Sequence, residues 1–448
     1  MIRRTVLEWK SLRYGETDDC IPEWAAGRIA AVASASPLGG EGGARILSHG
    51  RKELRAAQVV GVIAADGCAL EILPKIDGLG DGDEAIAKGR IRKKLVHMLA
   101  AVLDVDIASG AITELGWQRE NLLEILIGLF ARKLADAVRQ GIPRRYVAHA
   151  DDLPALRGRL NVTRQFTTLA ATPQKLACNY DALSPDIAVN QIMKAAILRL
   201  ARVSQNSENQ RRLREAAFAY ADISEVAVTA LRWDDVVLDR TNARWRELIS
   251  LARLLLGGRF QTTSSGSGKG FSLLFEMNTL FEEYIARMLV RALRGTGLSV
   301  HAQGGRRYCL EEIVDDLPGS SRFQTKPDIL IRRGNDIELI IDTKWKRLSA
   351  RIDDPKQGVS QADVYQMMAY GRLYECPRLM LLYPWHGELG RDPGTTARHR
   401  LALPGCDDQL ITATAHVGKS RPELEAALGA LVIQSLRYPS DAPELLLA

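Results

Sequence analysis

The 448-residue sequence predicts an α+β multidomain protein with three parts. Residues 1–110 alternate short apolar runs with Gly and Asp, which is typical of strands joined by turns. Apolar residues recur at spacings of three and four through much of residues 111–262, which indicates helices. Residues 263–448 mix strand-like and helix-like segments. We therefore expect a strand-rich N-terminal domain, a helical middle region and a C-terminal α/β domain with a mixed sheet.

Each expected element rests on a local pattern. Short β-branched runs predict strands at 5–9, 58–63 and 69–76. Amphipathic periodicity predicts helices at 91–103, 120–139, 189–201, 211–221, 243–256, 271–293 and 422–436. Gly141 and Pro143 end the helix at 120–139, because neither continues a helix well. We assign everything after about residue 376 to completing the C-terminal domain.

The composition, 46% hydrophobic and 25% charged, is that of a folded soluble protein. The longest apolar stretches, such as 125–131, fall far short of the roughly 20 residues that cross a bilayer. The start, MIRRTVLEWK, lacks an apolar signal core. We therefore expect a cytoplasmic protein without a membrane partner. The net charge of +6 is compatible with a nucleic-acid partner, but it does not indicate which surface would bind one.

Several common chemistries lack their sequence signatures. The six cysteines are scattered singly, so we expect buried thiols and neither a zinc site nor a disulfide framework. The segment 262–270 contains Gly268-Lys269, but a phosphate-binding loop would need Gly at position 263 and Ser or Thr at position 270. The chain has Thr263 and Gly270 there. We interpret this Gly- and Ser-rich segment as a domain linker.

The most informative segment is 325–346, TKPDILIRRGNDIELIIDTKWK. Residues 329–331 and 337–341 read as strands joined by a turn at Gly334-Asn335-Asp336, so we expect a β-hairpin. Asp328 begins one strand and Asp342 ends the other, and antiparallel pairing brings such positions together.

Side chains alternate faces along a strand, so Lys344 points the same way as Asp342. Two carboxylates and an ammonium group then share a small patch. Two carboxylates suit Mg²⁺, or Mn²⁺, and a nearby lysine can orient water or offset charge during phosphodiester hydrolysis. The alternative is structural: Asp342 and Lys344 form an exposed ion pair, and Asp328 after Pro327 is a turn residue.

The pattern P-D-x(13)-D-x-K, present as Pro327-Asp328 and Asp342-Thr343-Lys344, resembles the PD-(D/E)xK nuclease superfamily. Downstream, Gln366 and Tyr370 resemble the Q-x-x-x-Y helix of its RecB-like members and share one helical face.

RecB-like members often carry a further acidic residue on an upstream helix, where this chain has Glu282 and Glu283. Glu283 has a favourable partner in Arg287, four residues later, whereas Glu282 lies beside the apolar stripe. We therefore choose Glu282 as the further metal ligand, beside Asp328 and Asp342.

A longer resemblance covers roughly residues 60–375. Seven segments resemble, in the same order, the McrC subunit of McrBC-type, modification-dependent (type IV) restriction systems: 69–76, 153–160, 178–194, 275–285, 325–329, 340–346 and 362–370. The resemblance implies a DNA-cleaving subunit that acts on double-stranded DNA with modified cytosine. It also implies a partner AAA+ GTPase of the McrB kind, whose GTP hydrolysis the subunit stimulates. Asp328, Asp342 and Lys344 are then catalytic, supported by Gln366 and Tyr370.

Two other functions fit the same residues. A stand-alone RecB-like repair nuclease would share the hairpin and the Gln366 helix but need no GTPase. A non-catalytic scaffold that activates a GTPase would leave the hairpin charges on the surface. The N-terminal domain is our candidate for partner docking, since the nuclease motifs lie in the other half. A basic cluster at 156–160, near Arg144-Arg145, could contact phosphates or an acidic partner, or could be structural.

Overall fold

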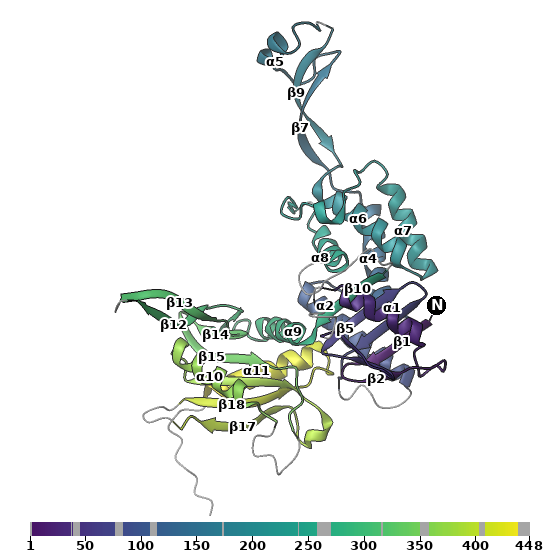
Figure 1. Ribbon diagram of the computed structural model, residues 1–448. Helices are drawn as coiled ribbons and strands as arrows, with labels where there is room; N and C mark the ends of the chain where they lie inside the picture. Colours follow the sequence, from purple (N-terminus) through teal and green to yellow (C-terminus); the bar gives the residue numbers. More distant parts are fainter. Residues whose placement is uncertain are drawn as a thin grey trace, which may run out of the picture. The chain divides into compact units, whose positions relative to one another are not determined.

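The computed structural model describes residues 2–36, 38, 45–76, 84–107, 114–172, 174–240, 242–257, 270–314, 317–349, 358–402 and 408–437. The chain forms two compact units (Figure 1). Unit 1 contains Met1–Asp104, Ile112–Leu122 and Phe260–Ala448, and unit 2 contains Val105–Ala111 and Leu123–Arg259. The mixture of helices and several sheets confirms the α+β multidomain prediction. All of the predicted linker except Gly270 lies outside the described residues.

The first part of unit 1, which we call the N-terminal lobe, is built on a four-stranded sheet of order β1-β6-β5-β10. Its strands and the small three-stranded sheet beside it are β1 (Ile2–Leu7), β6 (Cys68–Leu73), β5 (Val59–Ala65), β10 (Gly270–Glu276), β2 (Ser11–Arg13), β4 (Glu53–Ala56) and β3 (Leu47–His49). Helix α1 (Glu23–Ser34), which the sequence analysis missed, packs its buried alanines and Ile29 into the same core. The strand-rich prediction therefore omitted one helix.

Strand β10 corrects the predicted helix at 271–293. All seven residues of β10 pair with β5 in antiparallel fashion, and helix α9 (Met277–Ala292) begins only afterwards. Residues 271–275 are all buried, and a short run that is apolar apart from Ser272 has no clear periodicity to separate strand from helix. A segment that follows the predicted linker thus completes the N-terminal lobe.

Gly61 allows β10 to approach β5. It lies opposite Leu274 with a φ of +136°, and a Cβ there would stand 1.9 Å from the Leu273 carbonyl oxygen. We expect Gly61→Ala to lower the free energy of unfolding by about 3 kcal/mol, because both backbone strain and a steric clash result. Gly27→Ala, in the middle of α1 with open space around it, should instead raise it by about 0.5–1 kcal/mol. Urea unfolding of both variants measures this, and equal effects would contradict the account.

The second part of unit 1, which we call the C-terminal lobe, holds a six-stranded mixed sheet of order β11-β14-β15-β16-β18-β17. Strands β15, β16 and β18 run parallel to one another, and the remaining pairs are antiparallel. The elements are β11 (Ser299–Ala302), β14 (Ile329–Arg333), β15 (Asp336–Thr343), β16 (Arg378–Pro384), β17 (Gly394–Arg400), β18 (Gln409–Ala415), α10 (Gln361–Tyr374) and α11 (Arg421–Arg437). A separate hairpin, β12 (Arg307–Val314) with β13 (Leu317–Thr325), extends from this lobe (Figure 1).

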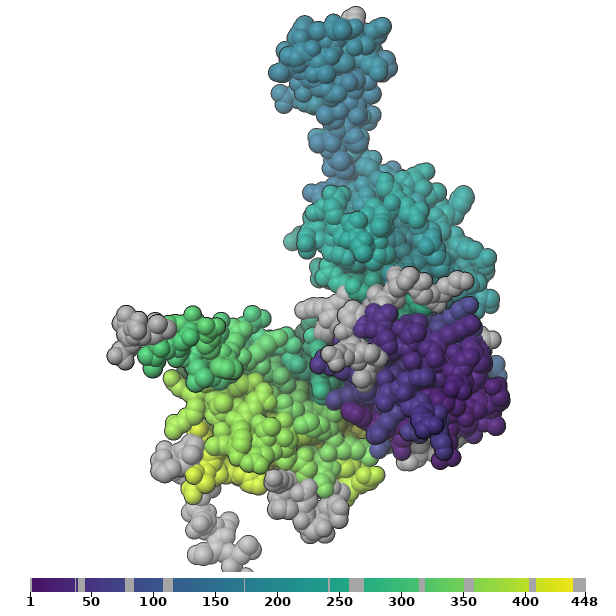
Figure 2. Space-filling model, viewed as in Figure 1, coloured from purple at the N-terminus to yellow at the C-terminus, as the bar shows by residue number. Residues whose placement is uncertain are grey.

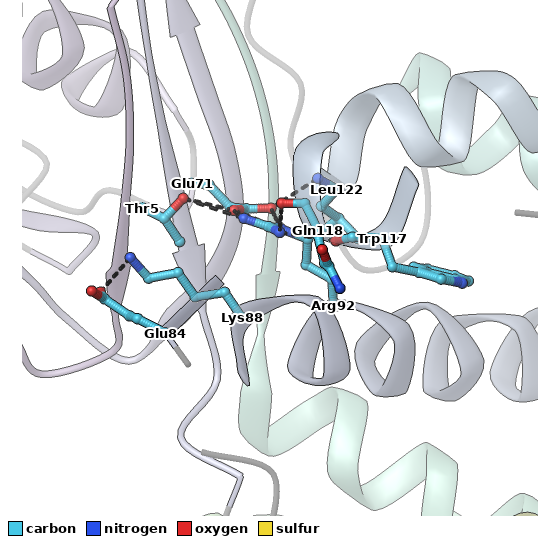
Figure 3. Close-up of polar contacts among 8 residues, drawn as sticks. All are labelled: Thr5, Glu71, Glu84, Lys88, Arg92, Trp117, Gln118 and Leu122. Atoms are coloured by element: carbon cyan, nitrogen blue, oxygen red, sulfur yellow. Dashed lines mark hydrogen bonds and ion pairs between the residues drawn. The ribbon is translucent and has the colours of Figure 1, made fainter. Parts of the chain in front are cut away.

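A buried ion pair ties helix α2 (Glu84–Leu103) to the N-terminal lobe (Figure 3). Arg92 donates from Nε and Nη2 to the carboxylate of Glu71 at 2.8–3.0 Å. Its Nη1 donates to the carbonyl oxygens of Trp117 and Gln118 in helix α3 (Glu114–Arg119). Glu71 also accepts the backbone N–H of Leu122. The buried charges are thus fully hydrogen-bonded, which is what burial requires.

Unit 2 combines helices with an arm. Its helices are α4 (Leu122–Arg139), α6 (Ala188–Val203), α7 (Ser207–Ala219) and α8 (Trp245–Leu256); the first residue of α4, Leu122, belongs to unit 1. The arm, β7 (Arg145–Leu153), β8 (Arg159–Leu160), β9 (Leu176–Ser184) and α5 (Val162–Thr167), stands clear of these helices (Figure 2). The sequence analysis did not predict the arm, because β7 buries none of its residues and shows no apolar alternation.

Two smaller predictions have outcomes in the fold. Cys68, Cys178 and Cys376 are buried as predicted, but Cys309 on the solvated β12 is exposed and Cys20 is half-buried. Cys406 lies outside the described residues. No helix among the described parts of the chain has the length and apolar character to span a bilayer.

Candidate active site

The predicted hairpin is present and forms the centre of the site. In the antiparallel pair of β14 and β15, Ile329 lies opposite Ile341. Asp328 directly precedes Ile329 and Asp342 directly follows Ile341, so antiparallel pairing places the two aspartates side by side. The turn that joins the strands has Gly334 at a φ of +62°, a left-handed conformation that favours glycine. The apolar residues 329–331 of β14 and 339–341 of β15 are buried, because these strands lie inside the sheet.

Asp328 is fixed by the residue that follows Asp342. Its Oδ2 accepts the backbone N–H of Thr343 at 2.8 Å and the Thr343 hydroxyl at 2.9 Å. Burial and the nearby carboxylate of Glu282 raise the pKa of Asp328 to about 6, although the two Thr343 bonds act in the opposite direction. One oxygen is thus held in place, while the whole carboxylate sits in an environment that disfavours its charge.

Asp342 and Lys344 form a close pair beside Asp328. Asp342 is only 1% exposed, and its Oδ2 lies 2.6 Å from the Lys344 ammonium nitrogen. Burial and the charge of Asp328 raise the pKa of Asp342 to about 6. Burial also works against the charge of Lys344, but the surrounding aspartates, Asp342 foremost, outweigh burial and raise the pKa of the ammonium group. The Asp342 side chain is buried and that of Lys344 is 19% exposed, so the alternative of an exposed surface ion pair does not describe them.

Helix α10 brings Gln366 and Tyr370 to the same place. The Lys344 ammonium donates to Gln366 Oε1 at 3.2 Å, and Gln366 Nε2 donates to the Tyr370 hydroxyl at 2.7 Å. Tyr370 in turn donates to the Lys326 carbonyl at 3.4 Å. Burial raises the pKa of Tyr370 to about 12, so it remains a neutral donor. Because Gln366 and Tyr370 are four residues apart on one helix, they form part of a chain of hydrogen bonds that begins at the Lys344 ammonium group.

Asp363 belongs to the site, but the sequence analysis missed it. It is buried on α10, one turn before Gln366, and accepts the Lys346 ammonium group at 3.0 Å. Its other oxygen lies 3.9 Å from Lys344 Nζ. A signal was available, because residues three apart share a helical face and Asp363 precedes Gln366 by three.

Glu282 lies near the aspartates, but other groups bind it directly. Its Oε1 accepts from Gln303 Nε2 at 2.9 Å, and Gln303 Oε1 accepts from Lys326 at 2.7 Å. Burial raises the pKa of Glu282, and Asp342 contributes a small effect in the same direction. Its electrostatic effect on Asp328 places it close to the site. Its role as a metal ligand stays a prediction.

The donor set suits a divalent cation held by two carboxylates. Among the described residues, no three Asp, Glu, His or Cys side chains are grouped closely enough to hold a metal ion by themselves. Mg²⁺, however, commonly binds through one or two carboxylates and completes its octahedron with water and phosphate oxygens. Burial is the main cause of the raised pKa values of Asp328 and Asp342, and repulsion from Glu282 at Asp328 and from Asp328 at Asp342 adds to it. A cation between the carboxylates would offset both effects. The residues therefore fit Mg²⁺ or Mn²⁺ at this position.

The basic cluster at 156–160 belongs to the arm of unit 2, whereas the aspartates and Lys344 belong to unit 1. The guanidinium group of Arg157 packs over the ring of Tyr180 at 4.1 Å, which is a structural role. Arg144, Arg145 and Arg159 are exposed.

The fold and the site together define an α+β protein that carries two aspartates and a lysine at the open end of a β-hairpin in a mixed sheet. Residues 54–384 match the family described as McrBC 5-methylcytosine restriction system component. The chain belongs to this family and is a McrC-like component of a McrBC restriction system.

Similar proteins agree with this assignment. Over 304 residues, the chain is 22% identical to the type IV methyl-directed restriction enzyme EcoKMcrBC of Escherichia coli K12, which covers 65% of this chain and 83% of that protein. The fold resembles that of a chain in a half-complex of Thermococcus gammatolerans McrB AAA+ hexamers with bound McrC. The TM-score is 0.64 and the identity 20%, over 96% of this chain and 99% of the matched chain. The T. gammatolerans McrBC complex also matches, with a TM-score of 0.50 and 23% identity over 65% of this chain and 88% of that chain.

Proposed function

We propose that this chain is the DNA-cleaving subunit of a modification-dependent restriction complex, and that it hydrolyses phosphodiesters of double-stranded DNA carrying modified cytosine. The observation that carries the proposal is the pair of buried Asp342 and half-buried Lys344 beside Asp328, at 2.6 Å between Nζ and Oδ2. A protein gains little stability from gathering three charges at a largely buried place, so such an arrangement suggests chemistry.

The residues divide the work of hydrolysis. Asp328 and Asp342 would hold Mg²⁺ or Mn²⁺, which when bound activates water and polarises the phosphodiester. Thr343 keeps Asp328 oriented through two hydrogen bonds. Lys344 places a fixed positive charge where negative charge develops on the phosphate, and such preorganised charge stabilises a transition state. Gln366 holds that ammonium group, and Tyr370 fixes which end of the Gln366 amide faces it.

We further propose that the chain works with an AAA+ GTPase of the McrB kind. The structural relative from T. gammatolerans comes from an assembly of McrB AAA+ hexamers with bound McrC. This chain aligns with 99% of the matched chain of that assembly. The sequence also has no complete phosphate-binding loop of its own, as Thr263 and Gly270 indicate. GTP binding and base recognition would then lie on the partner. Docking through residues 1–110 stays a prediction.

The proposal predicts a specific pH dependence. Because a cation binds ionised carboxylates and both aspartates have pKa values of about 6, cleavage should fall steeply below about pH 6 and level off above about pH 7. Stability without metal should change in the opposite direction. The ordinary aspartate pKa is 3.8, so between about pH 4 and pH 6 the unfolded chain loses protons that the folded chain keeps, and stability falls as pH rises.

Both effects are measurable on the same protein. Cleavage rates in the complex with Mg²⁺ give the first profile, and the thermal midpoint of the chain in EDTA gives the second. Asp342→Asn should flatten part of the stability profile, because it removes one of the titrating groups. A cleavage rate that stays constant from about pH 5 to pH 8 would contradict a site built on these two carboxylates.

A further inference from the structure

A carboxylate of the N-terminal lobe reaches the residue next to the catalytic lysine. Glu8 lies just after β1 and is 2% exposed. Its Oε1 accepts the indole N–H of Trp345 at 2.8 Å and the backbone N–H of Lys75 at 2.9 Å. Glu8 and Trp345 are 337 positions apart in the sequence. Trp345 directly follows Lys344, so this bond joins the N-terminal lobe to the end of the hairpin.

Trp345 is held from several sides. Its backbone N–H donates to Asn278 Oδ1 on α9 at 3.1 Å, and its ring packs against Phe281 of the same helix at 5.3 Å between centroids. The preceding peptide is also fixed, because the Lys344 backbone N–H donates to the Leu382 carbonyl at 2.9 Å. The position of the backbone at Lys344 therefore depends on the contacts that Trp345 makes.

The burial of Glu8 works against the charge of its carboxylate, and two hydrogen bonds work for it. Burial raises the pKa of Glu8, whereas the hydrogen bonds from Lys75 and Trp345 act in the opposite direction because they stabilise the charged form. Within the part of the chain that the structure describes, the second oxygen of Glu8, Oε2, is buried without a hydrogen-bond partner, so the donors from Trp345 and Lys75 are the hydrogen bonds that offset the burial of this group. A buried carboxylate with an unpartnered oxygen is costly to keep, which favours a functional reason for it over simple packing.

We propose that Glu8 is a positioning residue: through the Trp345 indole it fixes the backbone that carries Lys344, so the N-terminal lobe sets part of the geometry of the cleavage site. The proposal rests on the nuclease function proposed above. Displacing a catalytic group by about 1 Å can reduce a rate by about 10²-fold even when the change lies away from the chemistry. The N-terminal lobe would in this way act on the rate of cleavage without contacting DNA.

The test compares three variants of the full chain, each assembled with its GTPase partner. Trp345→Phe keeps the ring against Phe281 but removes the donor to Glu8. Glu8→Gln keeps an acceptor of the same shape. Trp385→Phe is the matched control, because the Trp385 indole donates to the Arg391 carbonyl at 2.8 Å in the same lobe, away from Lys344. We expect kcat for DNA cleavage to fall about tenfold or more in Trp345→Phe, with KM unchanged, and to stay within about twofold in the other two.

An activity-independent readout separates this idea from the proposed function. In protein labelled with ¹⁵N-tryptophan, the indole N–H signal that Trp345→Phe removes should shift in Glu8→Gln, because the acceptor changes from a carboxyl group to an amide. Equal kcat in Trp345→Phe and Trp385→Phe would overturn the positioning role while leaving the nuclease intact. A loss in Glu8→Gln as large as in Trp345→Phe would also overturn it, since the bond is retained there. If the wild-type complex does not cut at all, the proposed function fails and the positioning role fails with it.

Discussion

Asp342→Asn should reduce DNA cleavage on the order of 10³-fold or more and should leave the fold intact. The amide has nearly the shape of the carboxylate, but it cannot supply the negative charge that holds a divalent cation and balances Lys344. Asp342 is 1% exposed and its pKa is raised to about 6, so ionising this group at neutral pH lowers the free energy of unfolding. We therefore expect the thermal midpoint of Asp342→Asn to be equal to or higher than that of the wild type.

A matched control lies on the same strand. Asp336 begins β15 and is exposed at the turn, so Asp336→Asn makes the same chemical change six residues before Asp342. It should cut like the wild type. Assembly with the GTPase and stimulation of GTP hydrolysis should survive in both variants. An Asp342→Asn protein that cuts normally would show that this carboxylate is structural, and one that has lost both cleavage and GTPase stimulation would show a general folding defect.

Arg92→Met should have the largest effect on stability. It removes the guanidinium group that satisfies Glu71 and leaves that carboxylate buried without a charge partner. Breaking a buried ion pair in this way costs about 3–5 kcal/mol, and whole domains are stable by only about 5–15 kcal/mol. The carbonyl oxygens of Trp117 and Gln118 would lose their donor as well. We expect a large drop in the urea midpoint, or no folded protein at 37 °C.

The control for this prediction is the neighbouring pair drawn in Figure 3. Lys88 lies one turn before Arg92 on α2 and pairs with Glu84 at 2.6 Å, but Glu84 is 76% exposed. Lys88→Met should cost at most about 0.5 kcal/mol, because solvent screens an exposed helix pair. If Arg92→Met were no more destabilising than Lys88→Met, the buried network would not be holding α2 to the sheet. Adding Glu71→Met to Arg92→Met should recover part of the loss, since it removes the unpaired charge.

Local patterns were enough to predict the hairpin and the helix that faces it. Asp328, Asp342 and Lys344 lie within one hairpin, so strand alternation and antiparallel pairing bring them together. Gln366 and Tyr370 are four apart on one helix, and the bond between them follows from that spacing. Asp363 carried the same kind of signal, so its omission was an error of interpretation.

Other features depend on contacts between distant segments. The run at 271–275 forms strand β10 because it pairs with β5, some 200 residues earlier, and so short a buried run does not reveal its period. The arm of unit 2 has almost no buried face, so hydrophobic patterning could not predict it. The bond from Glu8 to Trp345 joins residues 337 positions apart, and no short-range rule relates them.

The most direct test of the account is cleavage of methylated and unmethylated duplex DNA by this chain, with and without the AAA+ GTPase of its own system, in Mg²⁺ and GTP. We predict cutting that requires methylation, GTP and the partner, and that disappears with Asp342→Asn. Robust cutting by the chain alone would contradict the restriction-subunit function and favour a stand-alone repair nuclease. No cutting in any mixture, together with stimulated GTP hydrolysis, would leave the chain a non-catalytic activator and the buried Asp342–Lys344 pair without a role in hydrolysis.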